Sequence, residues 1–347
     1  MHRSKLANAK SESAAWTRRR FIASLAGIGG SAHLHCLAAA SAGGLPPPET
    51  NKLRLISTPA ICAAPMYVAH ELLQTEGFTD IEYVKLDYAG PSAVLAAGQA
   101  DISADAIGVI LTRVAAGDPL VALAGLHLGC YELFGTQRVR AIRDLKGKTV
   151  TIDSLGGPQH IFLAAMAAYV GLDPRKDINW DIHPSGESMQ RFIDGKSDAF
   201  LGFPPQPQEL RDKKAGHVVV NTAVDKPWSE YYCCFIAANS SFVQKNPIAA
   251  KRALRAHLMA ADVCASQPER AARIIFDKGY SPKYEYALET MREVCYNAWR
   301  DYEPNNAVRF HALRLREVGM IKGDPNKLIA QGTDWRFLNE LKRELKA

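Results

Sequence analysis

The sequence lacks the cysteine spacing that marks zinc and redox sites. Six cysteines follow the first 42 residues, and no two of them are spaced as Cys-x-x-Cys. An adjacent pair, Cys233 and Cys234, lies in a predicted strand, where neighbouring side chains point to opposite faces. We therefore interpret the cysteines as small buried apolar side chains rather than as a zinc site or a disulfide framework. The six are Cys62, Cys130, Cys233, Cys234, Cys264 and Cys295.

Nucleotide and zinc-protease motifs are missing as well. The segment "KGKT" (146–149) resembles the end of a phosphate-binding loop, but Ile142 stands where that loop needs a glycine. The segment "HELLQ" (70–74) has Gln74 in place of the second zinc-binding histidine. Three histidines in predicted loops have no carboxylate or imidazole at ligand spacing, so we interpret them as hydrogen-bonding residues and expect no metal and no cofactor. These are His127, His160 and His183.

A surplus of positive charge is confined to the start of the chain. The 347 residues include 42 Lys and Arg against 36 Asp and Glu. Residues 1–42 hold six of the basic residues and one of the acidic ones, which leaves 36 against 35, or +1, for the rest. The remainder of the chain therefore gives no reason to expect a nucleic-acid partner.

The first 42 residues have the pattern of an export leader. Arg18 and Arg19 precede Phe21 and a weakly apolar run, and small residues follow near Ala40. The paired arginines resemble the twin-arginine signal, so we predict a signal peptide over 1–42, a proline-rich linker over 43–51 and a soluble periplasmic protein. The alternative is an amphipathic or membrane-anchoring first helix, although the apolar run is shorter than the ~20 residues that a span needs.

From Lys52 onward, predicted strands and helices alternate, and a glycine follows most helices. This βα repeat predicts a mostly parallel sheet covered by helices on both faces. A second such round begins after an extended segment near Cys130, residues 231–244 ("YYCCFIAANSSFVQ") are predicted to be extended, and from Asn246 the chain is nearly all helical. We predict two α/β lobes, the first made of 52–129 and 233–347 and the second of 130–232, with the ligand in the cleft between them.

The loop "SLGGPQH" (154–160) is the strongest candidate ligand contact that the residues alone indicate. Proline suits the first turn of a helix, and the glycines before it let the backbone approach a ligand closely. The free N–H groups of Gln159 and His160 at the helix start are suited to an anion. The alternative is a tight turn that binds only water.

Other candidates lie where predicted strands end, because ligands of such sheets bind beyond the carboxyl ends of the strands. Asp105 either caps the following helix or accepts a hydrogen bond from a donor on the ligand. Phe203, on the proline-rich turn "GFPPQPQ", and Trp228, near the second passage between lobes, are candidate aromatic contacts.

Three segments, in this order, resemble a known family. They are "GQADISADAIGVIL" (98–111), "IRDLKGKTVTIDSLGGPQHIFL" (142–163) and "FIDGKSDAFLG" (192–202). The chain is similar over about residues 51–260 to the periplasmic substrate-binding proteins of ABC importers in the sulfonate, nitrate and taurine group (SsuA/Thi5-like), which also contains pyrimidine-precursor binders.

The resemblance implies a type II periplasmic-binding-protein fold, in which two lobes joined by two crossing segments close on a small molecule. It further implies a monomer that delivers its ligand to an ABC permease, with a separate ATPase subunit supplying energy. No lysine or arginine occupies the loops where nitrate-type members hold their anion, so a larger aromatic or zwitterionic molecule is favoured over nitrate or a simple sulfonate. By position, the ligand contacts are Ala60, Ile61, Cys62, Ala104, Asp105, Gly156, Gly157, Gln159, His160 and Phe203.

Two other functions stay open beside binding. Relatives with this architecture include a desulfinase that uses a cysteine of the first loop, and Cys62 lies in that loop. Such a thiol needs an activating base, for which His70 and His127 are the candidates. A ligand-sensing subunit that reports to a membrane receptor would have the same sequence features. We expect a binding protein and not an enzyme.

Overall fold

The computed structural model describes residues 46–58, 60–86 and 90–345. The predicted signal peptide and the first residues of the predicted linker lie outside these ranges. Within them, no helix combines the length and the apolar character that a membrane span requires.

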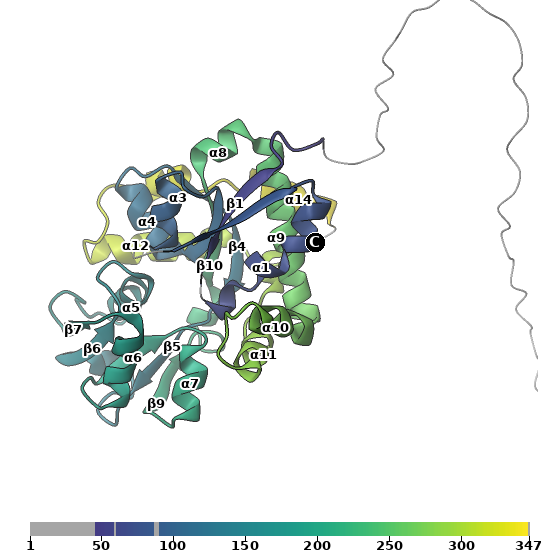
Figure 1. Cartoon of the computed structure of the whole chain (residues 1–347). Helices are drawn as coiled ribbons and strands as arrows, with labels where there is room; N and C mark the ends of the chain where they lie inside the picture. Colours follow the sequence, from purple (N-terminus) through teal and green to yellow (C-terminus); the bar gives the residue numbers. More distant parts are fainter. Residues whose placement is uncertain (1–45, 59, 87–89, 346–347) are drawn as a thin grey trace, which may run out of the picture. The chain divides into compact units, whose positions relative to one another are not determined.

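The first lobe is built on a five-stranded sheet with the order β2-β1-β3-β10-β4 (Figure 1). Strand β1 runs parallel to β2 and β3, whereas β10 runs antiparallel to both of its neighbours. Strands β3 and β4 are buried along their whole length, which explains the almost continuous apolar sequence of β4. The strands are β1 (Lys52–Ser57), β2 (Asp80–Lys85), β3 (Ile102–Ala106), β4 (Leu120–Leu128) and β10 (Tyr232–Asn239).

The second lobe repeats this plan with the order β7-β6-β8-β5-β9. Here β6 runs parallel to β7 and β8, and β5 runs antiparallel to β8 and β9. The strands are β5 (Glu132–Gly135), β6 (Lys148–Ile152), β7 (Ile178–Ile182), β8 (Ala199–Gly202) and β9 (His217–Asn221). The prediction of mostly parallel sheets holds for four strands of each sheet, and one strand, β10 or β5, runs against the other four. Each sheet is mixed because the strand that follows a passage between the lobes, β5 or β10, enters in the opposite direction.

Helices cover both sheets. Those of the first lobe are η1 (Ile61–Ala63), α1 (Pro65–Val68), α2 (His70–Thr75), α3 (Pro91–Ala96), α4 (Ile107–Ala115), α8 (Ser240–Lys245), α9 (Pro247–Ser266), α10 (Pro268–Asp277), α11 (Tyr284–Glu293), η4 (Asn297–Trp299), α12 (Pro304–Glu317), α13 (Pro325–Gly332) and α14 (Arg336–Glu344). Those of the second are η2 (Ile142–Leu145), α5 (Pro158–Tyr169), α6 (Ser185–Ile193), α7 (Gln206–Asp212) and η3 (Trp228–Glu230). The long helix α9 is rich in alanine and largely buried.

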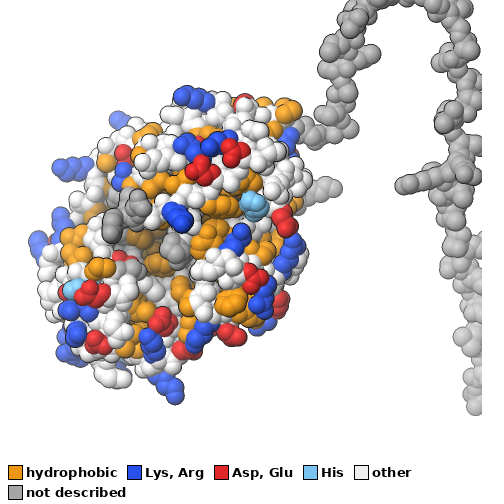
Figure 2. Space-filling model, viewed as in Figure 1, with side chains coloured by type: hydrophobic (Ala, Val, Ile, Leu, Met, Phe, Trp, Pro, Cys, Tyr) orange, Lys and Arg blue, Asp and Glu red, His pale blue; other side chains and the backbone are white. Residues whose placement is uncertain are grey.

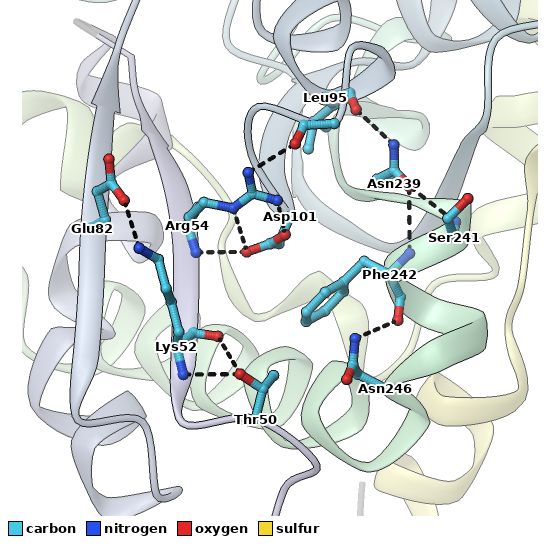
Figure 3. Close-up of polar contacts among 11 residues, drawn as sticks. Thr50, Lys52, Arg54, Glu82, Leu95, Asp101, Asn239, Ser241, Phe242 and Asn246 are labelled. Carbon is cyan, nitrogen blue, oxygen red and sulfur yellow. Dashed lines mark hydrogen bonds and ion pairs between the residues drawn. The ribbon is translucent and has the colours of Figure 1, made fainter.

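Residues 240–245 form helix α8 and not the extended segment that their sequence suggested. The Asn239 side chain caps this helix, since its Oδ1 accepts hydrogen bonds from the backbone N–H groups of Ser241 (3.0 Å) and Phe242 (3.4 Å) (Figure 3). Its Nδ2 donates to the Leu95 carbonyl at 2.8 Å, which fixes α8 against α3. In the same region the Arg54 guanidinium pairs with Asp101, joining β1 to the residue before β3.

The two passages between the sheets, residues 129–131 and 222–231, contact each other. The Thr222 N–H donates to the Tyr131 carbonyl, and the Tyr131 N–H donates to Thr222 Oγ1, both at 2.9 Å. They approach so closely that a Cβ on Gly129 would lie 2.0 Å from the Thr222 carbonyl oxygen. We call this contact the joint. Because both passages meet there, the two chain connections between the lobes run side by side.

Candidate functional site

A cavity of about 1080 Å³, here called the wide cavity, is lined by residues of both lobes. Its wall includes residues at or just beyond the carboxyl ends of five strands, which is the predicted position of a ligand site in such sheets. Figure 2 shows this face of the molecule hollowed between the lobes. These residues are Ser57, Lys85 and Asp105 from the first lobe and Asp153 and Phe203 from the second.

A smaller pocket of about 90 Å³, here called the inner pocket, shares Asp105 and Phe203 with the wide cavity. Its lining is almost entirely apolar and includes three cysteines. The sequence-predicted residues divide between the two spaces. Gly156, Gly157 and Gln159 line the wide cavity, Ala60, Cys62 and Ala104 line the inner pocket, and Asp105 and Phe203 line both, whereas Ile61, His160 and Trp228 line neither.

The loop before α5 presents its backbone to the wide cavity. Gly156 adopts φ +77°, a conformation that favours glycine, and a Cβ on Gly157 would lie 2.5 Å from Ser154 Oγ. Helix α5 begins at Pro158 with no side-chain cap, so its first N–H groups are available to a ligand. This arrangement matches the prediction of an open helix start.

His160 supports this loop from behind instead of facing the cavity. Its Nδ1 accepts a hydrogen bond from the Gly156 N–H at 2.9 Å, which requires that this nitrogen carry no proton. The ring packs edge-on against Trp180, with the ring centroids 4.7 Å apart. Burial lowers the pKa of His160 to about 4, so the ring is neutral near pH 7.

Asp105 caps a helix, but not the one that follows it. Its Oδ2 accepts hydrogen bonds from the Ser92 N–H (3.1 Å) and hydroxyl (2.6 Å) at the start of α3, and its Oδ1 accepts from the Ala106 N–H (2.7 Å). Helix α4 has no side-chain cap. Burial raises the pKa of the Asp105 carboxyl, which is only 7% exposed. The carboxylate thus holds the first turn of α3 on the cavity wall.

Two cations on the wall of the wide cavity were not predicted from the sequence, because neither lies in a loop predicted to hold the ligand. Lys85 lies at the end of β2, is exposed, and forms no ion pair among the described residues. Arg113 projects from α4 and pairs with Asp118 at 2.7 Å. An alternation of strands and helices does not tell which face of α4 borders the cavity, so Arg113 had no sequence signal.

Trp228, predicted as a ligand contact, packs where the second passage meets helices of both lobes. Its ring lies 5.2 Å from that of Tyr169 in α5 and 5.9 Å from that of Phe310 in α12, measured between centroids. The side chain is 5% exposed. Its role in the structure is therefore packing between lobes.

Four side chains that are distant in sequence meet at the inner pocket: Cys62, His127, Cys130 and Cys234, here called the cysteine–histidine cluster. One thiol or imidazole atom of each lies within 4.8 Å of those of the others. They come from η1, the end of β4, the first passage and the start of β10. Linear spacing gives no sign of this grouping, because the four residues belong to separate segments of the chain.

The register of two antiparallel strands explains half of the cluster. Cys234 of β10 pairs directly with His127 of β4, and irregularities in the ladder flank Cys234 on both sides. The sulfur of Cys233 consequently lies 3.8 Å from that of Cys234 and 3.5 Å from that of Cys130. Neighbouring cysteines of a regular strand would instead face opposite ways, as the sequence analysis expected.

Of the two histidines considered as a base for Cys62, His127 is the one that lies beside it. His70 contacts the Tyr83 hydroxyl instead, at 3.3 Å. A hydrogen bond with Cys130 lowers the pKa of the Cys62 thiol, but the contact with Cys234 and burial outweigh it, and the net shift is upward. Cys62 on its own therefore remains a thiol rather than a reactive thiolate.

Two mixed five-stranded sheets joined by two short passages define the fold of the periplasmic binding proteins, and solved structures share it at low sequence identity. The nitrate-binding protein NrtA of Synechocystis PCC 6803 is 17% identical, with a TM-score of 0.74 over 86% of this chain and 90% of that one. The alkanesulfonate-binding protein SsuA of Xanthomonas axonopodis pv. citri, solved with MOPS bound, is 17% identical, with a TM-score of 0.66 over 83% and 99%. The aliphatic sulphonate binding protein SsuA of Escherichia coli is 18% identical, with a TM-score of 0.63 over 81% and 91%.

The family described as NMT1/THI5 like matches residues 62–271, which is more than half of the chain. The chain therefore belongs to this family. No curated protein matches the sequence.

Proposed function

We propose that the protein is the solute-binding component of an ABC importer and works in the periplasm. The observation that carries this proposal is the wide cavity, which is lined from both lobes at the ends of their strands. A solute that contacts both walls binds the closed arrangement better than an open one, and so drives closure about the joint. The closed form is then presented to a permease, and a separate subunit hydrolyses ATP.

We propose an organic anion or zwitterion as the solute class, such as an organosulfonate, an aromatic acid or an amino-carboxylic compound. Lys85 and the open N-terminus of α5 suit a negatively charged group, and Phe203 offers an aromatic face. The cavity is larger than nitrate requires, since pockets of ~300–1,000 Å³ hold drug-sized molecules. Nitrate is therefore disfavoured here by the volume of the cavity, and no longer by charge, since Lys85 and Arg113 line its wall.

A thermal-shift screen over sulfonates, aromatic carboxylates, amines and pyrimidines tests both statements. We expect anionic or zwitterionic aromatic members to raise the Tm, and mass spectrometry to recover the stabilising compound unchanged. Stabilisation by amines alone would contradict the solute class. Conversion of the compound during incubation would contradict the binding role.

Export is proposed on the leader sequence alone. The twin-arginine route carries proteins across the inner membrane already folded, so replacing both arginines should block it. We expect the variant Arg18→Lys with Arg19→Lys to leave the full-length precursor in the cytoplasm, as seen by cell fractionation. Normal export of this variant would refute the twin-arginine assignment.

One observation favours a second function, an enzyme on the same fold. Cys62 and His127 lie side by side, as a thiol nucleophile and its base must. The raised pKa of Cys62 weighs against it. Product formation that disappears in Cys62→Ala would establish the enzyme. Ligand-induced stabilisation that persists in Cys62→Ala supports the binding protein.

A further inference from the structure

We propose that the cysteine–histidine cluster binds a thiophilic metal ion of the Zn²⁺ class in the wall of the inner pocket. This inference is independent of the solute and of the transport role. It rests on the positions of four donor atoms, on the orientation of one imidazole, and on the chemistry of the donor set.

The donor atoms are close enough for one ion. In a tetrahedral zinc site the Zn–S distance is ~2.3 Å and the Zn–N distance ~2.0 Å, so that neighbouring donors lie about 3.5–3.8 Å apart. In the structure all four lie within 4.8 Å of one another. Small side-chain rotations close the remaining gap, because each of the four residues contributes a single terminal atom.

The orientation of His127 points to a ligand on its free nitrogen. Its Nδ1 lies 2.7 Å from the Leu128 carbonyl oxygen, which has no proton of its own, so Nδ1 carries the proton and donates it. The side chain is 0% exposed, and Nε2 has no hydrogen-bond partner among the described residues. A buried acceptor without a partner is costly. Metal-binding histidines have this arrangement, in which one ring nitrogen donates to a backbone carbonyl and the other binds the ion.

The donor set selects the class of ion. Three sulfur atoms and one imidazole suit Zn²⁺ and its thiophilic relatives and disfavour Mg²⁺ and Ca²⁺, which require oxygen ligands. Among the described residues, Asp105 is the only carboxylate that lines the inner pocket, and its two oxygens already accept three hydrogen bonds. Four protein ligands complete the tetrahedron, so the site is of the closed, structural type.

The position of the cluster in the fold indicates the structural effect that a bound ion would have. Cys130 lies in the first passage between the lobes, and Cys234 lies just after the second. Cys62 comes from the loop that follows β1, on the first-lobe side of the pocket. An ion bound by all three would tie both passages to the first lobe and stiffen the joint on that side.

Cobalt titration of the full chain tests the site directly. The protein is reduced, stripped of metal with a chelator, and titrated with Co²⁺ alone. We expect one equivalent to give the near-ultraviolet thiolate charge-transfer band and the strong visible bands of tetrahedral cobalt. Zn²⁺ should then displace Co²⁺ and raise the Tm. Absence of thiolate–cobalt absorption from protein whose thiols are confirmed to be reduced would overturn the proposal.

Single substitutions locate the ion. Loss of even a second-shell partner costs ~10–100-fold in metal affinity, so Cys62→Ser, Cys130→Ser, Cys234→Ser and His127→Gln should each lower Zn²⁺ affinity more than about 100-fold. Cys264→Ser is the matched control, because Cys264 is fully buried in α9 and outside the cluster. An equal loss in Cys264→Ser, or full affinity in all four cluster variants, would contradict the assignment.

A measurement on the unmodified chain tests the site even if the substituted variants fail to fold. Zn²⁺ should protect Cys62, Cys130 and Cys234 from alkylation, as read by peptide mass spectrometry, while half-buried Cys295 reacts equally with and without the ion. The competing chemistry is a disulfide between Cys130 and Cys233, whose sulfur atoms lie 3.5 Å apart. Protein that carries this disulfide when freshly isolated from its periplasm, and that recovers no metal affinity after reduction, would overturn the proposal.

Discussion

The wide cavity and the inner pocket share Asp105 and Phe203, yet they are built from different chemistry. The wide cavity is lined by charged side chains, hydroxyl groups and a glycine-rich backbone segment, and its two walls belong to different lobes. The inner pocket is lined by apolar groups and thiols, mostly from the first lobe and the first passage. If a solute closes the lobes as proposed, the first space should change more than the second. On the two proposals made above, the wide cavity would hold an exchangeable solute and the inner pocket a bound ion.

The largest effect should come from the joint, which connects the two lobes that line the wide cavity and contributes Cys130 and Tyr131 to the inner pocket. In Gly129→Ala the new Cβ would meet the Thr222 carbonyl at 2.0 Å, and the backbone has to move. Overpacking costs ~1–3 kcal/mol and occasionally more, and since the obstacle here is backbone we expect more than about 3 kcal/mol. Urea denaturation measures it. Gly186→Ala is the control, because a Cβ there meets nothing within 4 Å and φ is not positive; similar losses in both variants would show that the joint is not special.

The second largest effect should come from acid, acting on His160 behind the loop that lines the wide cavity. The pKa of His160 is about 4 in the folded chain against an ordinary value near 6.5, so the unfolded chain binds more protons between these values. Stability is therefore full above pH 6.5 and falls as the pH drops towards 4, by up to about 3 kcal/mol for this residue. His257 and His311, also with pKa values lowered to about 4 by burial, add to the loss.

The variant His160→Gln separates this residue from the other two. We expect the pH dependence of the unfolding free energy between pH 4 and 6.5 to become shallower by up to one proton, while the part due to His257 and His311 remains. Solute affinity in the wild type should also fall with acidification, because a protonated Nδ1 no longer accepts the Gly156 N–H. An unchanged slope in His160→Gln would mean that the ring is already protonated, or solvated, in the fold.

Asp105 lines both spaces, and its substitution tests whether its carboxylate stabilises the fold or contacts the solute. Asp105→Ala removes three internal hydrogen bonds and leaves a buried hydroxyl and two N–H groups without their acceptor. Unsatisfied buried groups cost ~1–3 kcal/mol, so we expect the unfolding free energy to fall by about 2 kcal/mol. If solute affinity fell while stability in the absence of solute did not, the carboxylate would be a ligand contact, as the sequence analysis also allowed.

The smallest effect should come from Lys85. An exposed charge contributes ~0.2–1 kcal/mol, so Lys85→Gln should weaken an anionic solute only a few-fold and reduce the salt dependence of binding. Lys52→Gln is the matched control. Lys52 is at the start of β1, at the end of the sheet opposite Lys85, and pairs with Glu82. Isothermal titration at two salt concentrations compares them. Equal effects in both variants would remove Lys85 from the site.

Local patterns predicted the parts of this fold that depend on local chemistry. The strands β1 to β3 and β6 to β8, and the cavity at their carboxyl ends, followed from the alternation of strands and helices. The open start of α5 followed from Gly157 and Pro158. Asn239, which caps α8, is also a local signal, because asparagine at the end of a strand often begins a helix. The prediction that 240–244 is extended did not take it into account.

Features that depend on pairing between distant segments could not be predicted in this way. The directions of β5 and β10 are set by the passages between lobes, which carry no periodic pattern. The burial of Trp228 depends on Tyr169 and Phe310, which belong to two other helices. The cysteine–histidine cluster needs the register that sets Cys234 opposite His127, together with the irregularities beside it.

The position of β10 has a consequence for the order of synthesis. It lies between β3 and β4, and among the described residues β4 has no other strand partner apart from an isolated bridge between Ala122 and Thr333. A ribosome therefore releases the nine mostly apolar residues of β4 about a hundred residues before their partner strand exists. In that interval the whole second lobe is made and has its own complete sheet. The sheet of the first lobe is therefore complete only once β10 has emerged from the ribosome.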